Sequence, residues 1–281
     1  MGYEFKGKTA VITGGSSGIG LETAKKLAAK GVHLWLLARR VDVLEEAKRI
    51  VSGCRLNPEQ LVEVVSVDVA DSEQISRVFV QISERSGEPD ILINCAGITY
   101  PGYLETLKME IIQEQMDINY IGTVNTIKAV LPGMLARGSG SIVNVSSMNG
   151  IICLPGYSAY SASKFAVRAI SETLRAEVKR KGIHVAVIYP PDTDTPQHHF
   201  EIPLRPPEAA VLASLDKELK PEEVADEIIR AIDKKKFMVI PGLGNQFFYW
   251  FQSLTGTLAF PIFDLLLAWA LNKANHKGPG A

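Results

Sequence analysis

The chain has 281 residues, of which 46% are hydrophobic and 22% charged, a composition ordinary for a globular protein with a sizeable core. Its 30 basic and 31 acidic residues leave a formal net charge of -1, which gives no electrostatic reason to expect nucleic acid as a partner. Three scattered cysteines, Cys54, Cys95 and Cys153, and an N-terminus without an apolar signal core predict a reducing, cytoplasmic location, no disulfide framework and no metal site.

Short apolar runs alternate with longer helical patterns as far as about residue 240. This alternation predicts an α/β fold with a doubly wound parallel sheet and helices on both faces. Strands are expected at about 9–13, 33–38, 61–67, 90–94, 141–146, 183–189 and 237–240. Helices are expected at about 18–30, 41–52, 72–86, 108–136, 157–180 and 221–234. No composition shift divides residues 1–242, so they are expected to form a single catalytic domain, followed by a tail at 243–281.

A glycine-rich turn joins the first expected strand to the first expected helix. Glycines at this place let backbone amides approach a pyrophosphate at the helix N-terminus, where the helix dipole favours negative charge. The position between a strand and a helix predicts a dinucleotide site rather than a merely tight turn. The residues expected to hold the phosphates are Gly14, Ser16, Ser17, Gly18, Ile19 and Gly20.

The choice of cofactor is expected to be visible after the second strand, where the chain reads Ala38-Arg39-Arg40. An acidic residue there would bind the ribose 2′-hydroxyl of NAD, whereas arginine accommodates the 2′-phosphate of NADP. Two guanidinium groups and no carboxylate predict NADPH, with Arg39 as the main contact; Arg40 is alternatively a solvated charge. Later strand ends add residues expected near adenosine, unless they form ordinary turns: Asp68, Val69, Asn94, Ala96 and Gly97.

Tyr160 and Lys164 stand four residues apart in an expected helix, so both lie on one face. A phenol has an unperturbed pKa of about 10, and an adjacent ammonium group is expected to lower that pKa. The pair therefore suits proton exchange with a substrate oxygen, although the same spacing is common on protein surfaces. A hydroxyl group lies upstream, after the strand at 141–146, supplied by Ser147 or its neighbour Ser146.

Two segments depart from the alternation. Residues 190–220 are rich in proline and polar groups before a helical stretch from about Glu208, and are expected to form a substrate lid. Phe237 to Phe263 contains no formally charged residue and includes five consecutive aromatic residues at 247–251. This tail predicts an interfacial or re-entrant membrane contact, with a lid or dimer contact and a spanning helix as alternatives. His198 and His199 lack partners at ligand spacing and are not expected to bind metal.

Several motifs occur in order along residues 6–242: Thr13-Gly-x-x-x-Gly-x-Gly, Asn94-x-Ala-Gly, Asn119-x-x-Gly, Ser147 and Tyr160-x-x-x-Lys164. Together they resemble the short-chain dehydrogenase/reductase family. The resemblance implies a Rossmann-type sheet in the order 3-2-1-4-5-6-7 and a homodimer or homotetramer. It implies that Ser147 polarises the substrate oxygen and that Tyr160 is the general acid/base. Lys164 would lower the tyrosine pKa and hold the nicotinamide ribose, and Asn119 would keep a water in the proton relay. Ser147 is preferred to Ser146 because the family's serine usually stands 13 residues before the tyrosine, as Ser147 does.

The segment after the sixth strand reads Tyr189-Pro190-Pro191-Asp192-Thr193-Asp194-Thr195-Pro196, where the family usually has Pro-Gly. This segment looks like the 3-ketodihydrosphingosine reductase branch of the family. Alignment with the family implies that Pro190, Thr193 and Thr195 face the nicotinamide end of the cofactor, although aspartate and threonine also make local turns.

The branch implies a function: reduction of a long-chain ketone, 3-ketodihydrosphingosine, to dihydrosphingosine by hydride from NADPH. A lipid substrate fits a protein at a membrane surface, at the cytosolic face of the endoplasmic reticulum in a eukaryote or the inner membrane in a bacterium. Two alternatives stay open. One is a family member acting on another apolar alcohol or ketone, such as a steroid, retinoid or fatty-acyl derivative. The other is a catalytically silent NADP-binding membrane scaffold.

Overall fold

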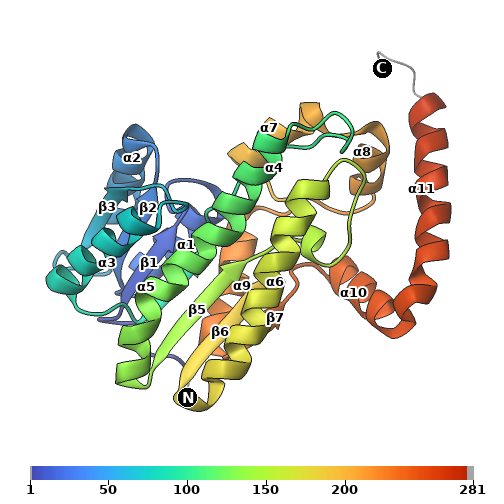
Figure 1. Cartoon of the computed structure of the whole chain (residues 1–281). Helices are drawn as coiled ribbons and strands as arrows, with labels where there is room; N and C mark the ends of the chain where they lie inside the picture. Colours follow the sequence, from blue (N-terminus) through green and yellow to red (C-terminus); the bar gives the residue numbers. More distant parts are fainter. Residues whose placement is uncertain (1, 277–281) are drawn as a thin grey trace.

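A seven-stranded parallel sheet forms the centre of the protein, in a computed structural model that describes residues 2–276 (Figure 1). The strand order is β3-β2-β1-β4-β5-β6-β7, which confirms the predicted Rossmann-type fold. Each strand falls within or beside its predicted range; the bounds are β1 Thr9–Thr13, β2 His33–Ala38, β3 Val62–Ser66, β4 Ile91–Asn94, β5 Gly140–Val145, β6 Ile183–Ile188 and β7 Met238–Val239. Because β1 and β4 are neighbours, the chain reverses its direction of winding there and leaves a crevice at their carboxyl ends.

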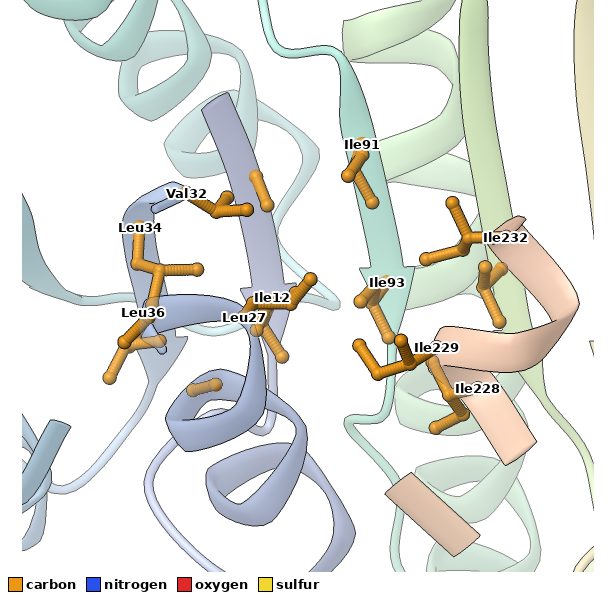
Figure 2. Close-up of a cluster of buried hydrophobic side chains, with 14 of the residues drawn as sticks. Ile12, Leu27, Val32, Leu34, Leu36, Ile91, Ile93, Ile228, Ile229 and Ile232 are labelled. Carbon is orange, nitrogen blue, oxygen red and sulfur yellow. The ribbon is translucent and has the colours of Figure 1, made fainter. Parts of the chain in front are cut away.

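Two layers of helices cover the sheet, and each buries one set of alternating strand residues. Ala10 and Ile12 of β1 pack with one layer, α1 Gly18–Ala28, α2 Val41–Ser52 and α9 Pro221–Asp233. Figure 2 shows part of this core, with Ile228 and Ile232 of α9 beside β4. Val11 packs with the other layer, which includes α3 Ser72–Ser86, α5 Gly122–Arg137 and α6 Ser158–Val178. Burial on both faces explains why the strands are continuous apolar runs.

The single helix expected over 108–136 is interrupted. The chain forms α4 Met109–Met116, a π-helical turn Asp117–Ile121 and then α5. A π turn inserts one extra residue per turn and changes the direction in which its side chains point. Asn119 lies within this turn and is buried. The helical periodicity of the sequence continues through such a turn, so no local pattern indicated it.

The expected lid is more helical than its sequence suggested. After β6 it forms α7 Pro196–Glu201, a 3-10 turn Ile202–Leu204 and α8 Pro207–Ala213. The helix therefore starts at Pro196 and not near Glu208. Thr195 explains the early start, because its hydroxyl caps α7 by accepting a hydrogen bond from the His198 amide at 3.2 Å, and proline is favoured in the first turn.

Two helices follow the sheet: α10 Leu243–Thr255 and, after a 3-10 turn, α11 Ala259–His276. Gly256 has a φ of 53° at the junction, which lets the chain change direction. Figure 1 shows α10 leaving beside β7 and α11 turning back toward α8, which it contacts. The stretch Leu243–Asn275 has a mean hydropathy of 1.7 and is long and apolar enough to cross a membrane by length and composition. Residue 1 lies outside the described part of the chain, and so do residues 277–281, the end of the expected tail.

Candidate active site

A cavity of about 520 Å³ opens at the carboxyl ends of the central strands. Its walls come from the glycine turn after β1, the ends of β4 to β6, the start of α6, the lid, and the helices α10 and α11. The structure brings Ser147, Tyr160 and Lys164 together on this wall. Asn119 is not among the lining residues, although it contacts residues next to them.

Tyr160 is nine-tenths buried in the first turns of α6. Burial raises the pKa of its phenol above the ordinary value, Glu201 and Asp192 raise it further, and the Ser147 hydroxyl opposes the rise. Lys164, which was expected to lower this pKa, is not among the groups that shift it. The Lys164 ammonium lies 5.6 Å from the centre of the Tyr160 ring, and its hydrogen bond goes elsewhere.

Lys164 is anchored to the end of β5. Its Nζ donates a hydrogen bond to the Val145 carbonyl at 3.0 Å, and the side chain is buried. Burial lowers the pKa of this ammonium group from 10.5 to about 8. A Cβ placed on Gly97 would stand 3.3 Å from Nζ, so this glycine in the loop after β4 packs tightly against the end of the lysine side chain.

The two candidate serines differ in their partners. The Ser146 hydroxyl donates to the Lys164 carbonyl at 2.9 Å and is buried, so it joins β5 to α6. The Ser147 hydroxyl accepts a hydrogen bond from the Asn149 amide at 3.1 Å and keeps its own proton available toward the cavity and Tyr160. The geometry therefore favours Ser147 as the hydroxyl that meets a substrate oxygen.

The side chain of Asn119 connects the loop after β4 to α6 by hydrogen bonds. Its side chain accepts from the Ile98 amide at 2.8 Å and donates to the Ile98 carbonyl and to Ser163 Oγ, both at 2.9 Å. The Asn119 backbone carbonyl accepts from Thr123 Oγ1 at 2.8 Å. These contacts hold Ile98 and the start of α6 together, whereas the expectation was a water in a proton relay.

The glycine turn fits a pyrophosphate. Gly14 has a φ of 64° and Gly18 a φ of 52°, values that favour glycine. A Cβ on Gly14 would stand 2.8 Å from the Ala96 amide nitrogen, so only glycine permits this close approach between the two loops. Ser17, Gly18 and Ile19 line the cavity at the start of α1, whose N-terminus favours an anion. Ser16 is buried beside them.

The expected adenosine end lies apart from the cavity. Arg39 and Arg40 are exposed at the end of β2, with no carboxylate among them. Asp68 accepts a hydrogen bond from the Ala70 amide at 3.0 Å, and Val69 is buried next to it. Asn94 differs from its expected environment: its side chain donates to Asn144 Oδ1 at 2.9 Å and accepts from Thr126 at 2.7 Å. Its amide is thus used inside the core, whereas the residues that follow it, Cys95, Ala96 and Gly97, line the cavity.

The loop after β6 is pinned next to Ser147, because the Met148 amide donates to the Pro190 carbonyl at 3.0 Å. Thr193 makes the local bond that its turn alternative predicted, donating to the Pro191 carbonyl at 2.9 Å. Thr195 caps α7, and its methyl group lies where a Cβ on Gly18 would be 3.0 Å away. Pro190, Thr193 and Thr195 all line the cavity.

The sequence did not indicate a charged cluster under the lid. Arg205 donates to Asp192 at 2.6 Å, to Glu201 at 2.5 Å and to the Tyr157 hydroxyl at 2.8 Å. His198 joins this cluster, and ligand atoms of Asp192, His198 and Glu201 lie within 4.8 Å of one another, close enough to hold a metal ion. Arg205 already sits on both carboxylates as their cation. His198, Glu201 and Arg205 follow one another at helical spacing, but Asp192 lies in the loop after β6, and no local pattern indicated that it would join them.

A parallel sheet with its candidate catalytic side chains at the carboxyl edge is typical of Rossmann-type enzymes. Residues 8–202 match the family model described as short chain dehydrogenase, and the chain belongs to that family. It is therefore an oxidoreductase that acts on a CH-OH or C=O group with a nicotinamide cofactor.

Relatives extend this similarity. The chain is 41% identical over 225 residues to the bovine protein named 3-ketodihydrosphingosine reductase, covering 80% of this chain and 68% of the relative. A Dictyostelium discoideum protein of the same name is 34% identical, covering 95% of this chain and 84% of the relative. Among solved structures, levodione reductase is 27% identical with a TM-score of 0.78, covering 86% of this chain and 98% of its own.

Proposed function

We propose that this enzyme reduces 3-ketodihydrosphingosine to dihydrosphingosine with NADPH. The single observation that carries the proposal is the mixed lining of the cavity. Ser147 and Tyr160 line it together with Phe248, Phe263 and Leu266 of the two tail helices. A ketone with a long alkyl chain fits such a cavity, because the carbonyl meets hydroxyl groups while the chain meets apolar side chains. The names of the bovine and Dictyostelium relatives support the same substrate.

Ser147 and Tyr160 both interact with the carbonyl oxygen of the substrate, in different roles. Ser147 donates a hydrogen bond to it and so stabilises the charge that develops there. Tyr160 gives its proton to the same oxygen; its raised pKa keeps the phenol protonated at neutral pH, as reduction requires. When bound, the reduced nicotinamide supplies the hydride to the ketone carbon.

Lys164 and Asn119 support these two residues. The side chain of Lys164 extends from α6 to the end of β5 and lines the cavity. There its Nζ can also donate a hydrogen bond to a ribose hydroxyl of the cofactor. With a pKa of about 8 it is mostly charged at pH 7 and can donate that hydrogen bond. Asn119 holds the Ile98 loop and α6 in register around them.

NADPH is proposed over NADH because of the end of β2. Arg39 and Arg40 are exposed there and offer two guanidinium groups to a 2′-phosphate, while Asp68 and Val69 lie at the neighbouring strand end for adenine. Comparing kcat/KM with NADPH and NADH tests this choice. We expect Arg39→Ala to lower kcat/KM for NADPH by about tenfold or more and to leave that for NADH nearly unchanged. An equal loss with both cofactors would contradict the assignment.

Membrane contact and assembly belong to the same proposal. The tail helices expose large apolar side chains along their length, including Phe247, Trp250 and Leu254. We propose that this surface lies at a lipid interface, at the cytosolic face of the endoplasmic reticulum in a eukaryote or the inner membrane in a bacterium. A homodimer or homotetramer, expected from the family, stays a prediction that the mass of the purified protein in solution would test.

A substrate comparison tests the proposed function. Purified protein is assayed with NADPH on 3-ketodihydrosphingosine and, side by side, on a steroid ketone, a retinal and a fatty-acyl ketone. The highest kcat/KM is expected on the sphingoid ketone, and a higher value on any other would replace that substrate. Tyr160→Phe is expected to lower kcat by about a hundredfold or more. Unchanged turnover in Tyr160→Phe would refute the mechanism, and no turnover of any ketone would favour a scaffold.

A further inference from the structure

Two carboxylates stand on the wall of the cavity that holds Tyr160. Glu201 ends α7 and is only 7% exposed, and Asp192 lies in the loop after β6; both line the cavity. The hydrogen bond from the Met148 amide to Pro190 places the loop that carries Asp192 next to Ser147. The carboxylates are therefore close to the point where the substrate carbonyl is expected.

Each carboxylate uses one oxygen in the cluster under the lid. Arg205 bonds Asp192 Oδ2 at 2.6 Å and Glu201 Oε1 at 2.5 Å. Among residues 2–275, no hydrogen-bond donor reaches the second oxygen of either side chain, Asp192 Oδ1 or Glu201 Oε2. Both acceptors remain available to a ligand in the cavity.

The charges of this cluster do not cancel. One guanidinium group faces two carboxylates, which leaves one negative charge. His198 lies 3.4 Å from Glu201 through Nδ1 and 3.1 Å from Glu218 through Nε2. A protonated His198 therefore does not remove the negative charge, because Glu218 adds a third carboxylate to the count. The remaining negative charge also acts on the reactive centre, since Glu201 and Asp192 are among the causes that raise the pKa of Tyr160, after burial. A cation bound beside the ketone would oppose that effect.

We propose that Asp192 and Glu201 bind the ammonium group next to the ketone of the substrate, and so make the enzyme specific for α-amino ketones. This inference rests on the proposed function, because the amino group of 3-ketodihydrosphingosine is on the carbon beside the carbonyl. An ammonium group has three donors and one positive charge, which match two available carboxylate oxygens and one uncompensated charge. A divalent metal ion matches the cluster less well, since Arg205 already occupies both carboxylates.

The test compares two ketones on the full-length protein with NADPH. One is 3-ketodihydrosphingosine, and the other is the same chain with hydrogen in place of the amino group. For the wild type we expect kcat/KM to be about ten- to a hundredfold higher on the amino ketone. In Glu201→Gln and in Asp192→Asn, the ratio of the two kcat/KM values is expected to fall by about tenfold.

Asp194→Asn is the matched control. It neutralises a carboxylate of the same loop that pairs with His199 and does not line the cavity, and its ratio is expected to equal that of the wild type. A wild type that does not reduce the amino ketone refutes the proposed function itself. If the wild type reduces both ketones equally well, only the inference is overturned. This outcome does not depend on whether a variant folds. The inference is also overturned if both variants keep the wild-type ratio, or if EDTA removes the activity and a divalent metal restores it.

Discussion

Ser146 and Ser147 are neighbours at the end of β5, yet their hydroxyl groups have different partners. Only Ser147 offers its proton to the cavity, while Ser146 is bonded to the Lys164 carbonyl. We expect Ser147→Ala to lower kcat/KM by about a hundredfold, because a hydrogen bond to the developing oxyanion is lost, with little change in Tm. Steady-state kinetics and thermal unfolding of each variant measure the two effects.

Ser146→Ala serves as the control for that experiment. It leaves the Lys164 carbonyl without its partner in a buried place, so it is expected to destabilise the protein by about 1–3 kcal/mol. The reverse pattern, with activity lost in Ser146→Ala and stability lost in Ser147→Ala, would give Ser146 the catalytic role.

Lys164 predicts a pH dependence of stability. Its pKa is lowered by burial from 10.5 to about 8, so below pH 8 the folded state holds a desolvated charge and is destabilised by it. Between about pH 8 and 10.5 the unfolded chain binds more protons at this site than the folded protein, so stability at this site rises with pH.

Lys164→Met removes this titration. The difference in Tm between Lys164→Met and the wild type is therefore expected to shift in favour of the wild type as the pH rises from 8 to 10. Thermal unfolding of both proteins at several pH values measures it, and the groups common to both cancel in the difference. A Tm difference that stays constant over this range would contradict a Lys164 pKa lowered by burial.

At the scale of elements, hydrophobic periodicity was sufficient to predict a strand or helix where that element is regular. The run at 33–38 is apolar because both of its faces are covered, and it became β2. Periodicity was insufficient in the helix expected over 108–136. The π turn at Asp117–Ile121 depends on the contacts of Asn119 with Ile98 and Ser163, which come from other parts of the chain. Contacts between residues far apart in the sequence cannot be predicted from a local pattern.

Gly122, which begins α5 after that turn, gives a test at the same scale. Alanine normally stabilises a helix relative to glycine by roughly 0.5–1 kcal/mol. A Cβ on Gly122 would stand 2.5 Å from Val69 Cγ2, however, and Val69 is buried at the start of the loop before α3. We therefore expect Gly122→Ala to destabilise the protein by about 1–3 kcal/mol, measured by chemical unfolding.

Gly133, in the same helix, is the matched control. An added Cβ there would meet the side chain of Glu88, which is exposed and can move away. Gly133→Ala is expected to be neutral or stabilising. If both variants were stabilising, the close approach of α5 to Val69 would not exist in solution.

At the scale of the whole molecule, the sequence predicted which candidate residues share one cavity better than it predicted their surroundings. The positions of Ser147, Tyr160 and Lys164 follow from motifs at strand ends and on one helix face. The cluster of Asp192, Glu201 and Arg205 could not be predicted, because it forms only when α7 and the turn after it fold over the cavity. The contribution of the tail to the cavity is likewise a property of the folded chain, in which α10 and α11 return to the lid.

The exposed face of the tail leads to the last prediction. Leu254 is 83% exposed at the end of α10 and Leu258 is 75% exposed in the turn that follows. Burying each leucine in lipid would gain about 1.5–3 kcal/mol, and an aspartate there would oppose insertion. The double variant Leu254→Asp, Leu258→Asp is therefore expected to lower binding to phosphatidylcholine vesicles by at least about a hundredfold in a flotation assay.

Val80→Asp is the control, because Val80 is also exposed, at 56%, but lies on α3 away from the tail. It is expected to bind vesicles like the wild type, and both variants are expected to keep the wild-type Tm. A wild type that does not bind vesicles would refute the lipid contact. If the double variant instead changed the mass of the protein in solution without changing vesicle binding, this face would be a contact between copies of the chain. A lipid contact at α10 and α11 would place the apolar residues of the cavity lining, Phe263 and Leu266, beside the bilayer that holds the substrate.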